Sequence, residues 1–72
     1  MTLDKVAVGG AVKIARLNGA GPVKRRIMDM GLTKGTEVKV CKIAPLGDPI
    51  ELTVRGYELS IRKDEAAAIE VE

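Results

Sequence analysis

The strongest pattern in the chain is an alternation of apolar and polar residues over IELTVRGYELSIR, residues 50–62. The apolar side chains recur at every second position in two runs, and Arg55-Gly56 separates the runs. Such alternation is typical of strands with one buried face, and a glycine that accepts a positive φ suits a two-residue hairpin loop. The pattern predicts a β-hairpin that turns these side chains toward a core: Ile50, Leu52, Val54, Tyr57, Leu59 and Ile61.

Three further segments are predicted as strands. Residues 36–44 are rich in β-branched residues, while residues 10–17 and 69–72 alternate apolar and polar positions. Within 36–44 the valines share one face, and Cys41 and Ile43 fall on the other, which predicts a bulge or a sharp bend at that point. Short strands in so small a chain cannot form a sandwich of useful size, so we expect a small, strongly bent five-stranded barrel.

The stretch GPVKRRIMDMG, residues 21–31, predicts one short helix. Pro22 suits the first helical position, and Gly31 suits the position just past the end. At about 100° per residue, an apolar stripe faces inward and a basic face with one methionine faces outward. The inward stripe is Val23, Ile27 and Met30, and the outward face is Lys24, Arg25 and Met28.

Single helical turns are expected near both ends of the chain. Thr2 can cap a turn at the start that packs Leu3 and Val6 inward. Asp64 can cap a second turn over residues 65–68. Both turns would lie between or beside strands and would add little to the mainly β character of the fold.

Charge is distributed unevenly along the chain. Residues 1–63 contain all 12 Lys and Arg residues and only six acids, which gives a net charge of +6. Residues 64–72 contain four acids and no base. Near a helix N-terminus each cation is expected to cost about 0.3–1 kcal/mol, so local helix stability does not explain Lys24, Arg25 and Arg26. Two explanations remain, contacts to the acidic C-terminal segment and contacts to an acidic partner. Arg26, beside the apolar stripe, favours the first, and Lys24 with Arg25 favour the second.

Composition restricts the chemistry. The chain has 72 residues, enough for a single domain over residues 1–72, and Tyr57 is its only aromatic residue. With no histidine and with Cys41 as the only cysteine, an internal disulfide is excluded, a tetrahedral zinc site is disfavoured, and no Ser-His-Asp or Cys-His arrangement exists. We therefore expect no enzyme, no catalytic residues and no cofactor.

No apolar run approaches the roughly 18 residues that span a bilayer, and no signal-peptide pattern is present, which predicts a cytoplasmic protein without membrane insertion.

The basic body of the chain also raises nucleic acid binding as an alternative, because small barrels of this size do bind RNA or DNA. Recognition of single strands relies on aromatic stacking, which this chain cannot supply beyond Tyr57. The acids Glu37, Glu51 and Glu58 are interleaved along the strands and dilute any phosphate-binding face. Nucleic acid is therefore not the expected partner.

Two stretches, RRIMDMGLTKGTEVKV at 25–40 and GDPIELTVRGYELSIRKDEAAAIEV at 47–71, closely resemble the FeoA family of small ferrous iron transport accessory proteins. The resemblance runs over nearly the whole chain, and it lies in the order and spacing of its pieces. It implies a mainly β fold with one short helix, an SH3-like five-stranded barrel, in the cytoplasm. It also implies a partner, FeoB, the membrane ferrous iron transporter that carries a cytoplasmic GTP-binding domain.

The resemblance and the residues together predict a non-catalytic module that binds FeoB and has no metal site of its own. The residues expected to contact the partner are Lys24, Arg25, Met28, Leu46, Arg55 and Tyr57. A third hypothesis is transition metal ion binding by an Fe(II) chaperone or sensor with carboxylate ligands, for which Glu37, Asp48 and Glu51 are the candidates. The oligomeric state stays open.

Overall fold

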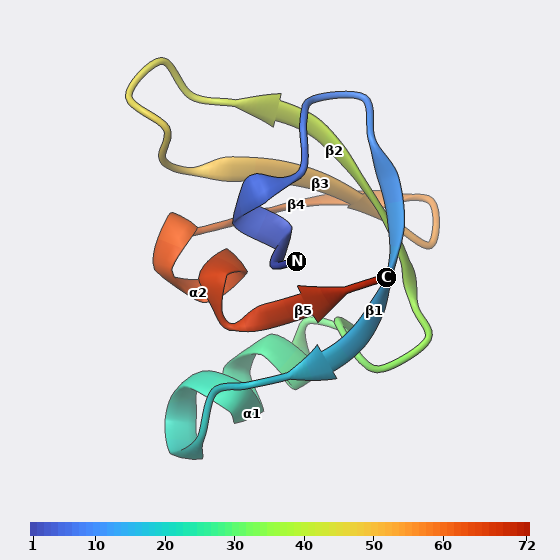
Figure 1. Cartoon of the computed structure of the whole chain (residues 1–72), viewed down its shortest axis with the longest axis vertical. Helices are drawn as coiled ribbons and strands as arrows, with labels where there is room; N and C mark the ends of the chain where they lie inside the picture. The colour runs from blue at the N-terminus through green and yellow to red at the C-terminus, as the bar shows by residue number, and fades with distance from the viewer.

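Antiparallel strands form a single curled sheet in the computed structural model, which describes residues 1–72 (Figure 1). The strand order across the sheet is β4-β3-β2-β1-β5. The mainly β architecture with one longer helix is the one that the sequence predicts. The elements in chain order are η1 (Leu3–Lys5), β1 (Ala11–Leu17), α1 (Gly21–Asp29), β2 (Glu37–Ile43), β3 (Ile50–Val54), β4 (Tyr57–Ile61), α2 (Lys63–Ala67) and β5 (Ile69–Val71).

The predicted hairpin forms from β3 and β4. Its register pairs Val54 with Tyr57 and runs down to Ile50 and Ile61. Both loop residues have a positive φ, 50° at Arg55 and 84° at Gly56. Two consecutive positive φ values define the type I′ turn, whose twist matches that of the flanking strands. The loop sequence therefore fixes the hairpin register as predicted.

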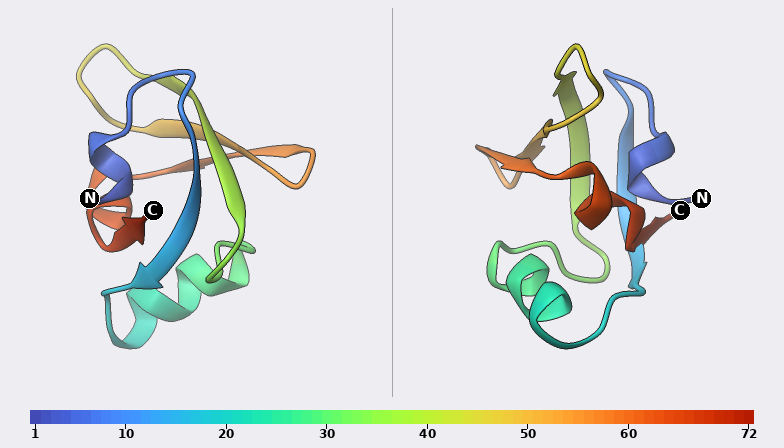
Figure 2. Two further views of the ribbon diagram at one scale, coloured as in Figure 1. Left: turned by 45° about the vertical axis from the view of Figure 1, so that its right-hand side comes forward. Right: turned by 90° about the vertical axis from the view of Figure 1, so that its left-hand side faces the viewer.

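The inward face of the hairpin is shorter than the alternation predicts. β3 alternates buried and half-buried residues over its whole length. In β4, Ile61 is buried and Leu59 is half-buried, but Tyr57 is 46% exposed. The prediction that Tyr57 faces the core is wrong because the tip of the hairpin projects beyond the barrel (Figure 2).

A bulge in β2 lies where the change of parity predicts it. The register between β2 and β3 shifts between Val40 and Lys42. Val38 and Val40 before the bulge are fully buried, whereas Cys41 and Ile43 at and after it are half-buried. The bulge bends the strand and lets the sheet curl into a barrel.

The core is built from aliphatic side chains, as the near absence of aromatic residues requires. The two edge strands of the sheet, β4 and β5, are not hydrogen-bonded to each other, and α2 joins them. The outer side of β5 is covered by a bridge from Thr2 to Glu70. The buried core residues are Leu3, Val6, Ile14, Ile27, Leu32, Val38, Val40, Ile50, Leu52, Val54, Ile61, Ala66, Ile69 and Val71.

The two short helical elements form, and Thr2 is the N-cap residue of η1 as predicted, whereas the cap of α2 differs from the prediction. The side chain of Thr2 makes no cap bond and instead hydrogen-bonds the carboxylate of Asp4. α2 begins one residue before Asp64, and its N-cap residue is Arg62. Glu65 supplies the capping contact there, because its Oε1 accepts a hydrogen bond from the backbone N–H of Arg62 at 2.8 Å. A glutamate three residues after the N-cap is the usual partner for that donor.

Glu65 also links α2 to α1. Its Oε2 lies 3.3 Å from Nε of Arg26, and Glu65 is 6% exposed while the side chain of Arg26 is 64% exposed. The prediction that Arg26 contacts the acidic C-terminal segment is thereby confirmed. Of the three consecutive cations of α1, Arg26 forms an ion pair within the fold. Lys24 and Arg25 form none, so their presence needs a different explanation.

Replacing Glu65 by alanine is expected to lower the free energy of unfolding by about 1.5–3 kcal/mol, since it removes a charged acceptor and leaves a backbone N–H without its partner. Glu65→Gln keeps an acceptor for that N–H and should cost about half as much. Chemical denaturation of the three proteins checks the order. Equal losses in both variants would show that the ion pair with Arg26 carries the whole effect.

Candidate interaction surface

α1 lies across one end of the barrel, beside the end of β1 (Figure 2). The helix ends before Gly31, whose φ of +89° is the left-handed conformation that the sequence predicts there. Ile27 is the only buried residue of α1, and Met30 packs partly against the core. Val23 is 46% exposed, so the predicted inward stripe is too long. The core contacts of this segment come from Ile27, Met30 and the fully buried Leu32. All three lie in the C-terminal half of α1 or just after it, so the first turn of α1 extends past the core.

Tyr57 holds the other end of this helix in place. Its hydroxyl donates a hydrogen bond of 2.8 Å to the backbone oxygen of Met30, at the C-cap of α1. A Cβ added at Gly31 would lie 2.8 Å from the same hydroxyl. The contact joins the tip of the β3–β4 hairpin to the C-terminal end of α1, which gives Tyr57 a positioning role in the fold.

We expect Tyr57→Phe to reduce the free energy of unfolding by about 0.5–1.5 kcal/mol, the usual net contribution of one hydrogen bond. The amide protons of α1 should exchange faster in this variant, since the helix loses a contact at its C-terminal end. Hydrogen exchange followed by NMR measures both effects. Unchanged exchange rates in α1 would show that the hydrogen bond does not hold the helix.

Two shallow depressions border the outer side of α1, and they share Lys24 and Met28. One, of about 370 Å³, is lined by Gly21, Lys24, Arg25, Met28 and Asp29. The other, of about 260 Å³, is lined by Ala15, Arg16, Leu17, Lys24, Met28, Thr33 and Lys34. We call the two together the helix surface. Lys24, Arg25 and Met28 thus lie on one surface, as their helical spacing predicts.

The helix surface is strongly positive. Its cations are Arg16, Lys24, Arg25 and Lys34, and its only acid is Asp29. None of these residues takes part in an ion pair, because the ion pairs of the protein are those of Glu70 with the N-terminus and of Glu65 with Arg26. Met28 is 45% exposed among these charges. The surface can therefore offer both charge and apolar area to an acidic partner.

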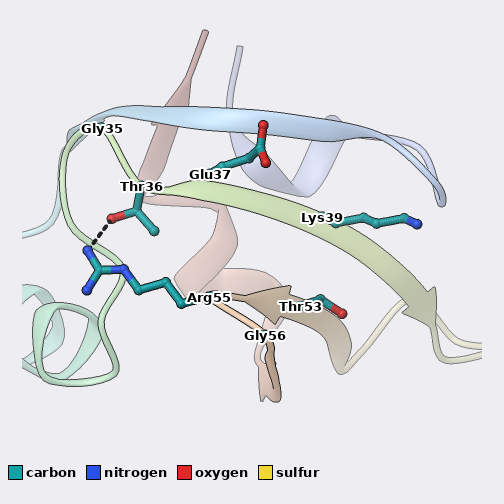
Figure 3. A pocket seen from close by; sticks show the side chains of 7 residues that line it. All are labelled: Gly35, Thr36, Glu37, Lys39, Thr53, Arg55 and Gly56. Atoms are coloured by element: carbon teal, nitrogen blue, oxygen red, sulfur yellow. Dashed lines mark hydrogen bonds between the residues drawn. The ribbon is translucent and has the colours of Figure 1, made fainter.

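Arg55 belongs to a different depression, near the tip of the hairpin (Figure 3). This depression of about 480 Å³ contains no apolar side chain and is lined by Gly35, Thr36, Glu37, Lys39, Thr53, Arg55 and Gly56. The guanidinium of Arg55 donates a hydrogen bond of 3.4 Å to Oγ1 of Thr36. Figure 3 shows Glu37 and Lys39 farther along β2, so the charges here are of both signs.

Leu46 lies on the loop between β2 and β3 and is 96% exposed. Figures 1 and 2 show this loop at the end of the molecule opposite α1. The residues expected to contact a partner therefore do not form one surface. The structure adds Arg16, Leu17 and Lys34 to the helix surface, and only the folded topology brings the end of β1 and the turn after α1 beside the helix.

The three carboxylates proposed as iron ligands, Glu37, Asp48 and Glu51, do not lie close together in the structure. No group of three or more His, Cys, Asp and Glu residues is close enough to hold a metal ion. Glu37 begins β2, whereas Asp48 lies in the loop after β2 and accepts a hydrogen bond from the backbone N–H of Lys63 at 3.0 Å. Glu51 stands opposite Lys42 in the sheet. This ligand set is therefore wrong.

Neither α-helix of the structure has the length and hydropathy that crossing a bilayer requires. Both α-helices are short, and α1 is the longer with nine residues. Its outward side is polar and basic apart from Met28.

Comparison with known proteins gives consistent results. The family model described as the FeoA domain matches residues 1–72. The chain is 38% identical over 72 residues to the Fe(2+) transport protein A/Fe(2+) transporter FeoB fusion protein of Porphyromonas gingivalis. The match covers 100% of this chain and 8% of that protein, so the chain spans a small part of the length of this relative.

Solved structures of similar proteins have the same fold. The NMR structure of a FeoA-like protein from Clostridium acetobutylicum matches with a TM-score of 0.94 and 46% identity, over 100% of this chain and 84% of that one. Iron(II) transport protein A from Clostridium thermocellum matches with a TM-score of 0.95 and 36% identity, over 100% and 44% of the chains. The zinc complex of Stenotrophomonas maltophilia FeoA, described as an SH3 domain protein, matches with a TM-score of 0.87 and 24% identity, over 100% and 89%. The predicted SH3-like fold is confirmed.

Proposed function

The chain belongs to the FeoA family, and we propose that it is a non-catalytic accessory protein of ferrous iron uptake that binds the cytoplasmic part of a FeoB-type transporter. The observation that carries the proposal is the fusion relative, in which one chain is named for both transport protein A and transporter FeoB. Fusion holds two domains at a high local concentration. Where the two are separate chains, no linker holds them together, so the smaller protein must bind the transporter through its own surface.

The helix surface supports this proposal. Its unpaired cations can steer an acidic partner toward the domain, and steering raises the association rate without changing the fold. Met28 adds apolar area that becomes buried on contact. The absence of histidine agrees with a binding role in place of catalysis. Binding to the cytoplasmic part of the transporter would require the protein to act in the cytoplasm.

Titration calorimetry against the isolated cytoplasmic domain of FeoB and against the full-length transporter in nanodiscs tests the proposal. We expect binding that weakens as salt is raised from 50 to about 300 mM, because exposed charges are screened over roughly one Debye length. A single-stranded RNA titrated in the same salt series serves as the control for nonspecific attraction to polyanions. No binding to either form of the transporter up to high micromolar concentration would contradict the proposal, and tighter binding to the RNA would favour the nucleic acid alternative.

A further inference from the structure

We infer that the smaller depression of the helix surface binds an acidic peptide segment that carries one large apolar side chain. We call this depression the β1–α1 groove; it lies between the end of β1 and the outer side of α1. The inference rests on the proposed function in so far as the segment belongs to the transporter. It adds to that function the chemistry by which the partner is recognised.

The apolar part of the groove comes from two elements that are distant in sequence. Leu17 and Ala15, both half-buried, lie at the end of β1, and Met28 projects from α1 with 45% of its surface exposed. A methionine side chain is unbranched and adapts its shape to what packs against it. The volume of about 260 Å³ is below the range typical of drug-sized ligand pockets. The groove therefore has room for a single large apolar side chain.

The charged part of the groove comes from three elements. Arg16 lies on β1, Lys24 on α1 and Lys34 in the turn after α1, and no acid lines the groove with them. None of the three forms an ion pair within the protein. Arg16 stands opposite Glu70 in the β1–β5 pair, but Glu70 does not line the groove. The like charges of Lys24 and Lys34 repel one another there, and an external anion relieves that repulsion. The arrangement favours a ligand with more than one carboxylate.

Arg16 has hydrogen-bond donors that remain available to a carboxylate. Its Nε donates a hydrogen bond of 2.9 Å to Oδ1 of Asn18, and Asn18 in turn donates to Glu70. The terminal nitrogens of the guanidinium have no partner in the protein. Two parallel hydrogen bonds from a guanidinium to a carboxylate are stronger and more specific than one, and the terminal nitrogens of Arg16 can offer them.

A peptide fits these features better than a nucleic acid or a free phosphate. Phosphate contacts would use the cations but leave Leu17 and Met28 without a role. A nucleic acid base would need an aromatic platform, and the groove has none. Apolar area framed by cations matches an acidic segment with one leucine, methionine or phenylalanine.

Three capped pentapeptides and the ¹⁵N-labelled full-length protein test the inference by backbone NMR shifts. The peptide EDLED should shift the amides of residues 15–17, 24, 28, 33 and 34, and it should bind at least threefold more tightly than EDAED. KRLKR should not bind. Equal affinities for EDLED and EDAED, or shifts confined to the hairpin depression, would overturn the inference. Concentration-dependent shifts of the same amides without peptide would also overturn it, because they would identify a second copy of the chain as the occupant.

Lys34→Glu and Lys39→Glu make a matched pair of variants. Lys34 lines the groove, whereas Lys39 lies on β2 and has the uncharged cross-strand neighbours Ala11 and Thr53. Lys34→Glu should weaken EDLED binding about three- to tenfold and Lys39→Glu should not, and unchanged spectra away from the substitution confirm that both variants are folded. Equal affinity of the wild type and Lys34→Glu for EDLED would overturn the inference.

The same two variants, titrated with the cytoplasmic domain of FeoB, separate this inference from the proposed function. If the domain binds wild type and Lys34→Glu equally, the groove is not the recognition site, although the proposed function stands. If the domain does not bind while EDLED binds in the groove, the proposed function fails and the groove chemistry stands. Loss of binding in Lys34→Glu alone supports both.

Discussion

Replacing both Lys24 and Arg25 by glutamate is expected to weaken binding to the cytoplasmic part of FeoB roughly 5- to 30-fold, or about 1–2 kcal/mol. Each reversal exchanges an attraction of about 0.25–0.5 kcal/mol for a repulsion of similar size, and the two reversals together give this loss. The loss should shrink as salt is raised, because both residues are exposed and screened. Titration calorimetry at two salt concentrations measures both quantities.

This variant separates binding from folding unusually well. The first turn of α1 contains no acid, and Lys24 lies close to the positive end of the helix macrodipole. Glutamate at position 24 gains from the helix dipole and glutamate at position 25 is repelled by Asp29 four residues later, so the stability of the domain should stay within about 0.5 kcal/mol. Reduced binding by a domain with a nearly unchanged melting temperature would therefore assign both cations to the partner. Retained binding would reject the helix surface without rejecting a transporter partner.

Replacing Ile27 by alanine is expected to destabilise the domain by about 2–4 kcal/mol, and to lower its melting temperature by on the order of 10–30 °C. Ile27 is fully buried and is the only buried side chain of α1. A small domain has a total stability of only several kcal/mol, so this loss is a large fraction of it. Thermal denaturation followed by circular dichroism measures the change.

Val23→Ala is the matched control for Ile27→Ala. It shortens a β-branched residue of the same helix, but Val23 is 46% exposed, so the change should stay within about 0.5 kcal/mol. A large loss in Val23→Ala would show that the first turn of α1 is packed in solution. A small loss in Ile27→Ala would show that the helix is not anchored by that residue.

The sequence predicts the fold well because most of its signals are local. Alternation fixes the faces of the strands, Arg55-Gly56 fixes the hairpin turn, and the change of parity at Cys41 locates a bulge. The errors at Tyr57 and Val23 share one cause. Periodicity gives the side of an element on which a residue lies, but the extent of the core decides how far along the element that side is buried.

The helix surface could be predicted only in part. Lys24, Arg25 and Met28 follow from helical spacing within one segment. Arg16 and Lys34 join them because β1 runs toward α1 and the chain turns back after it, which no local pattern records. The same limit explains the set Glu37, Asp48 and Glu51, which are near in sequence but lie on different parts of the barrel.

The most direct test of the account is the map of backbone NMR shifts of the ¹⁵N-labelled protein on addition of the cytoplasmic domain of FeoB. We predict that the perturbed amides cluster on the helix surface, at the end of β1, along the outer side of α1 and in the turn that contains Lys34. The loop that contains Leu46, at the opposite end of the molecule, should be unaffected. Shifts centred on that loop or on the hairpin depression, or no shifts at saturating domain, would contradict the account.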